Sequence, residues 1–183
     1  MYGLVNRAIQ QLVVSTKDEA AWQRVCRHAG VGADGFVAMC PYDDSVTYRL
    51  VGAVSEELGL PAAQVLEAFG EYWILYTADE GYGELMATAG ADLRAFLSNL
   101  DDMHARVETV FPKMKLPRFR FDEAGDGALR VTYSSERDGL APMVTGLLRG
   151  LGRRFEQAVE VEHVQGRAPG RPDDVFLVRP ATA

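Results

Sequence analysis

The stretch from Asp92 to Phe121 constrains this chain most, because it combines a long helical pattern with one histidine. Its apolar residues recur at steps of three and four, which is typical of a helix that buries one face. These residues are Leu93, Phe96, Leu97, Leu100, Met103, Val107, Val110 and Phe111. His104 lies four residues after Leu100 and three before Val107, so we expect its imidazole to point into the interior.

A histidine on an apolar face needs a partner, because an unpaired buried polar group costs about 1–3 kcal/mol. The simplest interpretation of His104 is a core residue that is hydrogen-bonded to a nearby carbonyl or carboxylate. The alternative is a metal ligand, since neutral imidazole commonly serves as one. The spacing by itself leaves both interpretations open.

A second short segment bears on that choice. Residues 129–133 read as a strand, and in an extended chain Tyr133, Ser135 and Arg137 would share one side. Their phenol, hydroxyl and guanidinium are all hydrogen-bond donors, and Arg137 can bind a carboxylate through two parallel hydrogen bonds. A strand edge followed by a solvated turn is the plainer interpretation. Together with His104, however, these donors supply what a b-type haem needs for its iron and its propionates.

Five stretches, taken in order, resemble the haem nitric oxide/oxygen binding (H-NOX) domain, the sensor domain of soluble guanylate cyclase and its bacterial relatives. They are MYGLVNRAIQQLV at the start, AFGEYWILYTADEGYGELMATAG in the centre, the His104 helix with Pro117 after it, the Tyr-x-Ser-x-Arg set, and GLAPMVTGLLRGLGRRF. The resemblance covers essentially the whole chain at the expected spacings.

The resemblance implies a role for each matching residue. His104 matches the proximal ligand of a five-coordinate ferrous haem b. Tyr133, Ser135 and Arg137 match the residues that bind the propionates. Pro117 matches a proline that presses on the macrocycle and distorts it.

The distal side is where the sequence departs from the oxygen-binding members. Those place a tyrosine early in the helix after the Tyr-x-Ser-x-Arg motif, and the corresponding place here is Pro142 or Met143, which have no hydroxyl. Only the indole of Trp73 could donate to a ligand. The expected distal lining is Val5, Ile9, Trp73, Ile74, Met143 and Leu147.

The implied function is a haem-based sensor of nitric oxide and carbon monoxide that signals to a partner protein. By resemblance the partner is a histidine kinase or a cyclic-nucleotide enzyme. No general base, nucleophile or phosphate loop is visible, so we do not expect an enzyme. The alternatives are an oxygen-binding or peroxidase-like haem protein, and a haem-free interaction domain in which His104 is a core residue.

Charge and cysteine pattern exclude several other classes. The formal charge of −7 argues against nucleic acid as a partner, and no apolar run approaches the roughly 20 residues that cross a membrane. Cys26 and Cys40 form neither C-x-x-C nor C-x-x-C-H, which excludes covalent haem attachment. Free thiols without an apolar leader favour a cytoplasmic location.

The periodicity along the chain predicts an α+β fold in one domain, 1–183. A mostly helical N-terminal part precedes a small antiparallel sheet with an inserted helix, and together they would enclose the b-type haem. Helices are expected over 1–16, 18–29, 43–58, 61–76, 92–111 and 140–155, with strands over 118–122, 128–133, 159–163 and 175–178.

Overall fold

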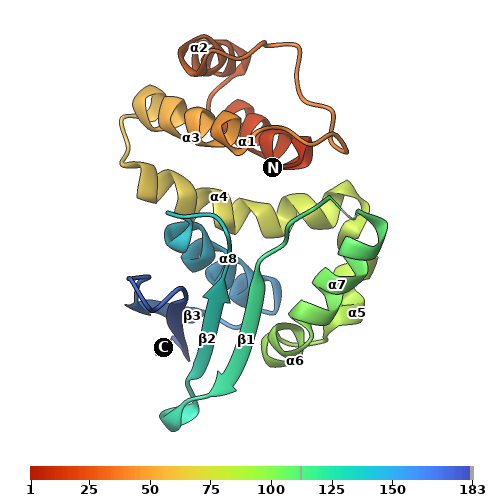
Figure 1. Ribbon diagram of the computed structural model, residues 1–183, viewed down its shortest axis with the longest axis vertical. Coiled ribbons are helices and arrows are strands. Elements are labelled where there is room, and N and C mark those ends of the chain that lie inside the picture. Colours follow the sequence, from red (N-terminus) through yellow and green to blue (C-terminus); the bar gives the residue numbers. More distant parts are fainter. Residues whose placement is uncertain (112, 182–183) are drawn as a thin grey trace. The chain divides into compact units, whose positions relative to one another are not determined.

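The computed structural model describes residues 1–111 and 113–181, and the chain divides into two compact units, Met1–Phe69 and Gly70–Ala183. Most of the first unit is formed by three mutually packed helices, α1 (Gly3–Thr16), α2 (Glu19–Ala29) and α3 (Asp44–Leu58) (Figure 1). The Asp18 carboxylate accepts a hydrogen bond from the Ala21 amide and caps α2, and Gly30 ends that helix in the left-handed conformation (φ 64°). These bounds match the expected helices.

Helix α4 (Ala62–Thr77) begins directly after Pro61 and carries the last residues of the first unit and the first residues of the second. Phe69, which belongs to the first unit, and Ile74, which belongs to the second, are both buried. Within residues 1–111 and 113–181, no helix combines the length and the apolar character that crossing a membrane requires.

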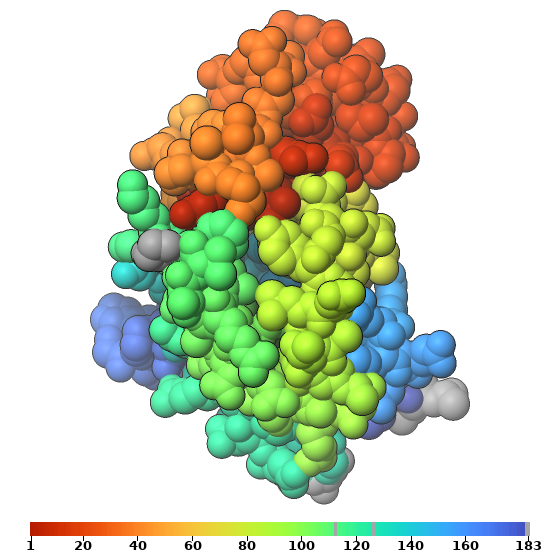
Figure 2. All heavy atoms as spheres, turned by 90° about the vertical axis from the view of Figure 1, so that its right-hand side faces the viewer, coloured from red at the N-terminus to blue at the C-terminus, as the bar shows by residue number. Residues whose placement is uncertain are grey.

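Four short helical segments follow in the second unit: η1 (Ala78–Tyr82), α5 (Gly83–Ala89), α6 (Leu93–Ser98) and α7 (Leu100–Val110). The chain turns before α5 in a π-helical kink, in which Gly81 has a φ of 94° that favours glycine. Helices α5, α6 and α7 pack on one another and form one outer face of this unit, coloured yellow-green to green in Figure 2.

The second unit also contains one four-stranded antiparallel sheet in the order β1-β2-β4-β3. Its strands are β1 (Arg118–Glu123), β2 (Leu129–Ser134), β3 (Val159–Gln165) and β4 (Asp174–Pro180), and α8 (Ala141–Arg154) connects β2 to β3. The two expected strand pairs therefore join through β2 and β4 into a single sheet.

One face of the sheet forms the core of the second unit. Leu129, Val131 and Tyr133 alternate as buried residues along β2, and Val131 lies opposite the fully buried Phe176 of β4. The same hydrophobic cluster takes in side chains from α5, α6, α7 and α8. Helices cover this face, while the other face is more polar along β2, where Arg130 and Thr132 alternate with the buried residues. The α+β prediction is confirmed.

The helix expected over 92–111 is broken at Asn99, which separates α6 from α7. The amide nitrogen of the Asn99 side chain donates to the Ala89 carbonyl (2.9 Å), a contact that fixes the break. Burial follows the expected pattern through Leu100, but Met103, His104 and Val107 are only partly buried and Val110 is 68% exposed. The prediction of one continuous buried face is therefore wrong for the second half.

Candidate functional site

His104 lies on α7 with its imidazole hydrogen-bonded to the backbone of the following loop. Its Nδ1 lies 3.1 Å from the carbonyl oxygen of Pro117. A carbonyl can only accept, so Nδ1 carries the proton and Nε2 keeps a lone pair. Nε2 makes no hydrogen bond to the described residues. The bond to Pro117 is the carbonyl contact expected of a core histidine, and it also leaves the other nitrogen suited to a metal.

Burial lowers the pKa of His104 below its usual value, although the Pro117 carbonyl and the nearby carboxylates of Asp101 and Glu108 oppose the shift. The folded protein therefore binds fewer protons at this residue than the unfolded chain does. Above the unfolded-state pKa of about 6.5 the imidazole is neutral in both states, and the folded protein keeps its full stability. That stability is lost as the pH falls below about 6.5 and through the lower pKa of the folded state.

We therefore expect the haem-free protein to lose stability as the pH falls below about 6.5, and His104→Gln to weaken this dependence. Urea melts of both proteins at pH values above and below that point measure it. Parallel curves for the two proteins would contradict it.

Two carboxylates fasten the His104 helix to the segment that follows it. Asp101 accepts a hydrogen bond from the backbone amide of Phe119 (2.7 Å). Glu108 accepts from the Leu116 amide (3.4 Å) and pairs with Arg118 (3.3 Å). Because these contacts lie one turn before and one turn after His104, they fix the face of α7 that presents the imidazole.

Tyr133, Ser135 and Arg137 are brought together, but not along one extended strand. Strand β2 ends at Ser134, and the chain bends over the next residues because the backbone amide of Arg137 turns back to donate to the Ser135 hydroxyl (3.1 Å). Tyr133 is buried, and burial raises the pKa of its phenol although the Ser135 side chain opposes the shift. The expected common strand side is therefore wrong: the three residues lie in sequence along a turn, and Arg137 meets the Ser135 hydroxyl with its backbone amide while its guanidinium reaches the Lys115 carbonyl.

The turn also contacts the segment that carries Pro117. Arg137 donates from Nη1 to the Lys115 carbonyl (2.8 Å), and Glu136 pairs with the Lys115 ammonium (2.6 Å). The backbone carbonyls of Lys115 and Pro117, two residues apart, thus accept hydrogen bonds from Arg137 and His104, respectively. The proposed iron ligand and the proposed propionate donors consequently meet at one short piece of backbone.

The predicted distal residues are divided between the two units. Trp73 on α4, and Met143 and Leu147 on α8, belong to the second unit, where all three are partly buried and Trp73 and Leu147 pack against the core. Val5 and Ile9 lie on α1 in the first unit, and Ile9 is 3% exposed. The distal lining as a whole remains a prediction.

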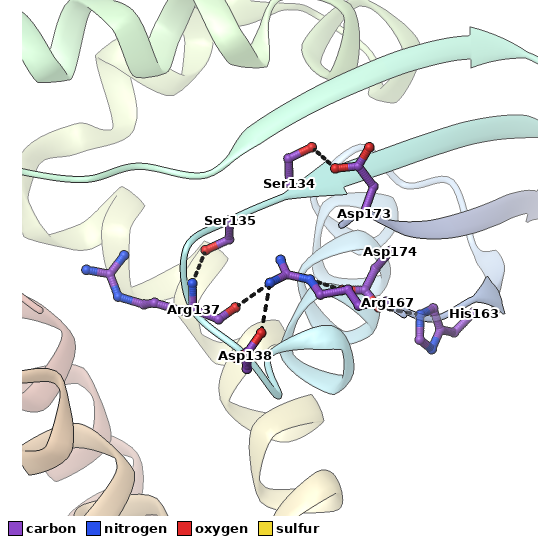
Figure 3. A network of polar contacts seen from close by, with 8 residues as sticks. All are labelled: Ser134, Ser135, Arg137, Asp138, His163, Arg167, Asp173 and Asp174. Carbon is purple, nitrogen blue, oxygen red and sulfur yellow. Dashed lines mark hydrogen bonds and ion pairs between the residues drawn. The ribbon is translucent and has the colours of Figure 1, made fainter. Parts of the chain in front are cut away.

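A polar network that the sequence patterns did not predict lies at the end of the sheet (Figure 3). Asp174 is 6% exposed and accepts from Arg167 Nε (2.9 Å), and its other oxygen pairs with His163 Nε2 (2.9 Å). His163 is exposed, yet its ring stacks on Phe176 (4.7 Å between centroids). An aspartate that directly precedes the apolar run of the last strand was the signal that could have found this network.

The donor set fits haem. A neutral imidazole with a free nitrogen suits the iron, and a phenol, a hydroxyl and a guanidinium within one turn suit the carboxylates. Fold and donors together thus describe an α+β haem-binding domain.

A family model described as Haem-NO-binding matches residues 2–163. Soluble guanylate cyclase gcy-35 of Caenorhabditis elegans is 33% identical over 171 residues, which are 91% of this chain and 25% of that protein. Guanylate cyclase soluble subunit beta-2 of Rattus norvegicus is 34% identical over 91 residues, 50% of this chain and 13% of that protein. The chain thus spans about a quarter or less of these relatives.

An H-NOX protein from S. oneidensis, solved in the Fe(II)NO ligation state, has a TM-score of 0.87 at 20% identity, covering 100% of both chains. An unliganded Fe(II) H-NOX protein from K. algicida has a TM-score of 0.85 at 18% identity, covering 100% of this chain and 98% of that one. At such identities the likeness shows the fold alone.

The chain belongs to the Haem-NO-binding, or H-NOX, family of haem-based gas sensors, and haem is the cofactor of that family. The family prediction made from the sequence is confirmed. The matched region is a non-catalytic sensor domain, which agrees with the expectation that the chain is not an enzyme.

Proposed function

We propose that this chain senses nitric oxide and carbon monoxide at a ferrous haem b whose protein ligand is His104. The observation that carries the proposal is the bond from His104 Nδ1 to the Pro117 carbonyl, since it directs the free Nε2 lone pair to a metal. Burial supports the same role, because it keeps the imidazole neutral near pH 7.

The remaining residues hold and orient the cofactor. Tyr133, Ser135 and Arg137 would bind the propionates, with the charged fork of Arg137 contributing most. Pro117 would press on the macrocycle while its carbonyl orients His104. When bound, haem supplies an iron that takes up a diatomic gas.

The distal side would decide which gas is held. Val5, Ile9, Met143 and Leu147 can exclude water, but none of them donates a hydrogen bond. Bound oxygen is strongly polarised and depends on such a donor, whereas nitric oxide and carbon monoxide do not. Trp73 is the one side chain of the predicted lining with an N–H, so the proposal favours nitric oxide over oxygen.

The signal would pass to a partner protein in the cytoplasm. The C. elegans relatives are guanylate cyclases, of which this chain matches about a quarter, and this favours a cyclic-nucleotide enzyme. A histidine kinase is the other partner class that the resemblance implies. An oxygen-binding or peroxidase-like haem protein remains the alternative function.

The test is gas uptake by the reduced, haem-loaded protein, followed by absorption spectroscopy. We expect uptake of nitric oxide and carbon monoxide but no reversible uptake of oxygen at the concentration present in air. Met143→Tyr adds a hydroxyl at the start of α8 and should gain oxygen uptake, with Met143→Phe as the matched control without a hydroxyl.

Three results would count against the proposal. Oxygen held for hours by the unchanged protein would overturn the selectivity. Turnover of peroxide faster than by free haem would favour the peroxidase-like alternative. A protein that shows no Soret band after expression with haem supplied would favour a haem-free domain.

A further inference from the structure

Arg167 lies beyond the last residue that the family model matches, yet its side chain reaches the haem-carboxylate turn, which we define as Tyr133–Gly139. We propose that Arg167, held by Asp174, is a positioning residue that sets the geometry of this turn for carboxylate binding. The inference rests on the proposed function, because it assigns a role in the same haem site.

The ion pair of Arg167 and Asp174 is anchored in the sheet opposite Tyr133. Asp174 is the first residue of β4, and its cross-strand partner in β2 is Tyr133. Both carboxylate oxygens of Asp174 are engaged, one by Arg167 Nε and the other by His163 Nε2, each at 2.9 Å. A buried carboxylate held at both oxygens has little freedom, so it fixes the guanidinium of Arg167.

The same guanidinium makes three further contacts, all to the turn. Its Nη1 donates to the backbone carbonyl of Arg137 (3.0 Å) and to the Asp138 carboxylate (3.2 Å) (Figure 3). Its Cζ lies 5.5 Å from the centroid of the Tyr133 ring, within reach of a cation–π contact. One planar group with fixed donor directions thus links strand β4 to the two ends of the motif, Tyr133 and Arg137.

The contacts of the Arg167 guanidinium differ in how much they can stabilise the turn. The Asp138 carboxylate is 94% exposed, so its pairing with Arg167 is screened by solvent and contributes little. The bond to the Arg137 carbonyl and the ion pair with Asp174 are the partly buried contacts. Arg167 Nη2 is also buried and has no hydrogen-bond partner among the described residues. Buried donors are ordinarily paired with an acceptor or an ordered water, so this nitrogen has capacity for one more acceptor.

The alternative is a purely structural role, in which Arg167 only holds neighbouring segments of the sheet together. A second arginine in the chain provides a matched comparison for this alternative. Arg179 of β4 pairs with Glu162 of β3 at 3.0 Å, on the same strand pair but without contact to the turn. If Arg167 merely holds β3 and the following loop to β4, replacing the guanidinium of either arginine should affect haem release to a similar extent. If Arg167 positions the turn, only its removal should reach the haem carboxylates.

The experiment compares Arg167→Lys with Arg179→Lys in haem-loaded protein. Lysine keeps the charge but cannot donate hydrogen bonds to the Asp174 carboxylate and the Arg137 carbonyl at the same time. We expect haem transfer to excess apomyoglobin to accelerate about ten-fold in Arg167→Lys, the size of one lost hydrogen bond to a charged group. Arg179→Lys should release haem at the wild-type rate.

Two readouts separate positioning from general weakening. The propionate bending vibrations in the resonance Raman spectrum should shift in Arg167→Lys and stay in place in Arg179→Lys. If Arg167 acts through Arg137, the double variant Arg137→Ala/Arg167→Lys should lose haem little faster than Arg137→Ala alone. Thermal melts of both lysine variants show whether they are equally folded.

Equal haem loss from the two lysine variants, unshifted propionate vibrations in Arg167→Lys, or fully additive effects with Arg137→Ala would each overturn the inference. A wild-type protein that takes up no haem would overturn the proposed function instead. In that case amide exchange still tests the turn, because the amides of Arg137 and Asp138 should exchange faster in haem-free Arg167→Lys than in haem-free Arg179→Lys.

Discussion

Replacing His104 by glycine should remove the protein ligand of the haem iron while leaving the protein able to take up haem. The cavity left by the imidazole faces the Pro117 carbonyl, which can receive the N–H of a free imidazole as it receives Nδ1 now. The carboxylate donors of the turn Tyr133–Gly139 are unchanged, so haem should still bind, though less tightly. Added imidazole should then restore the wild-type spectrum of the reduced protein.

The absorption spectrum of reduced His104→Gly, with and without imidazole, measures this. The matched control is His28→Gly, which removes an exposed histidine that pairs with Glu56 on the surface of the first unit. Its spectrum should equal that of the wild type, although glycine in a helix costs about 1 kcal/mol of stability. A reduced His104→Gly protein with an unchanged spectrum in the absence of imidazole would mean that another residue is the ligand.

Most element bounds were predictable because they are set by local chemistry. Asp18 caps a helix through its own side chain, Gly30 ends it with a left-handed backbone, and both signals are visible in a few residues of sequence. The alternating β2 strand and the glycine-rich connection to β1 likewise identify a hairpin. This helix and these two strands were therefore found from the sequence.

The errors arose where a distant contact decides the local conformation. The break at Asn99 depends on a hydrogen bond to Ala89, which helical periodicity cannot reveal. The chain after Ser134 leaves the strand because Arg137 turns back onto Ser135 and reaches Lys115. Strand alternation assumes an extended backbone, so it placed the predicted donors in the wrong geometry.

The candidate site was predictable only in its chemically distinctive residues. His104 stood out as a polar group on an apolar stripe, and its carbonyl partner was expected in kind although not by name. Arg167 carried no such signal, and the position of Asp174 before an apolar run was only a weak one, because their role depends on the pairing of β2 with β4 across 41 residues of sequence from Tyr133 to Asp174. Arginine and aspartate are ordinarily solvated, and only the three-dimensional register shows otherwise here.

Gly70→Ala should destabilise the second unit strongly, because the crossing of α4 and α8 leaves no space for a side chain there. A Cβ at this position would lie 2.1 Å from the Met143 carbonyl oxygen and 2.8 Å from the Leu147 amide nitrogen. Both atoms are backbone, so no side-chain rotation can relieve the overlap. The two helices must move apart at this point, and such overpacking typically costs about 1–3 kcal/mol.

The control for this prediction is Gly52→Ala, since Gly52 lies inside α3 and a Cβ there would meet no atom within 4 Å. Alanine favours helix over glycine by about 1 kcal/mol, so Gly52→Ala should raise the melting temperature while Gly70→Ala lowers it. The effect at Gly70 should also reach the predicted distal lining, because α4 carries Trp73 while α8 carries Met143 and Leu147. Separating the helices at Gly70 should therefore shift the C–O stretching vibration of the carbon monoxide complex, whereas Gly52→Ala should leave it in place. A Gly70→Ala protein as stable as wild type, with an unshifted vibration, would show that the crossing accommodates a methyl group and that its closeness does not shape the gas site.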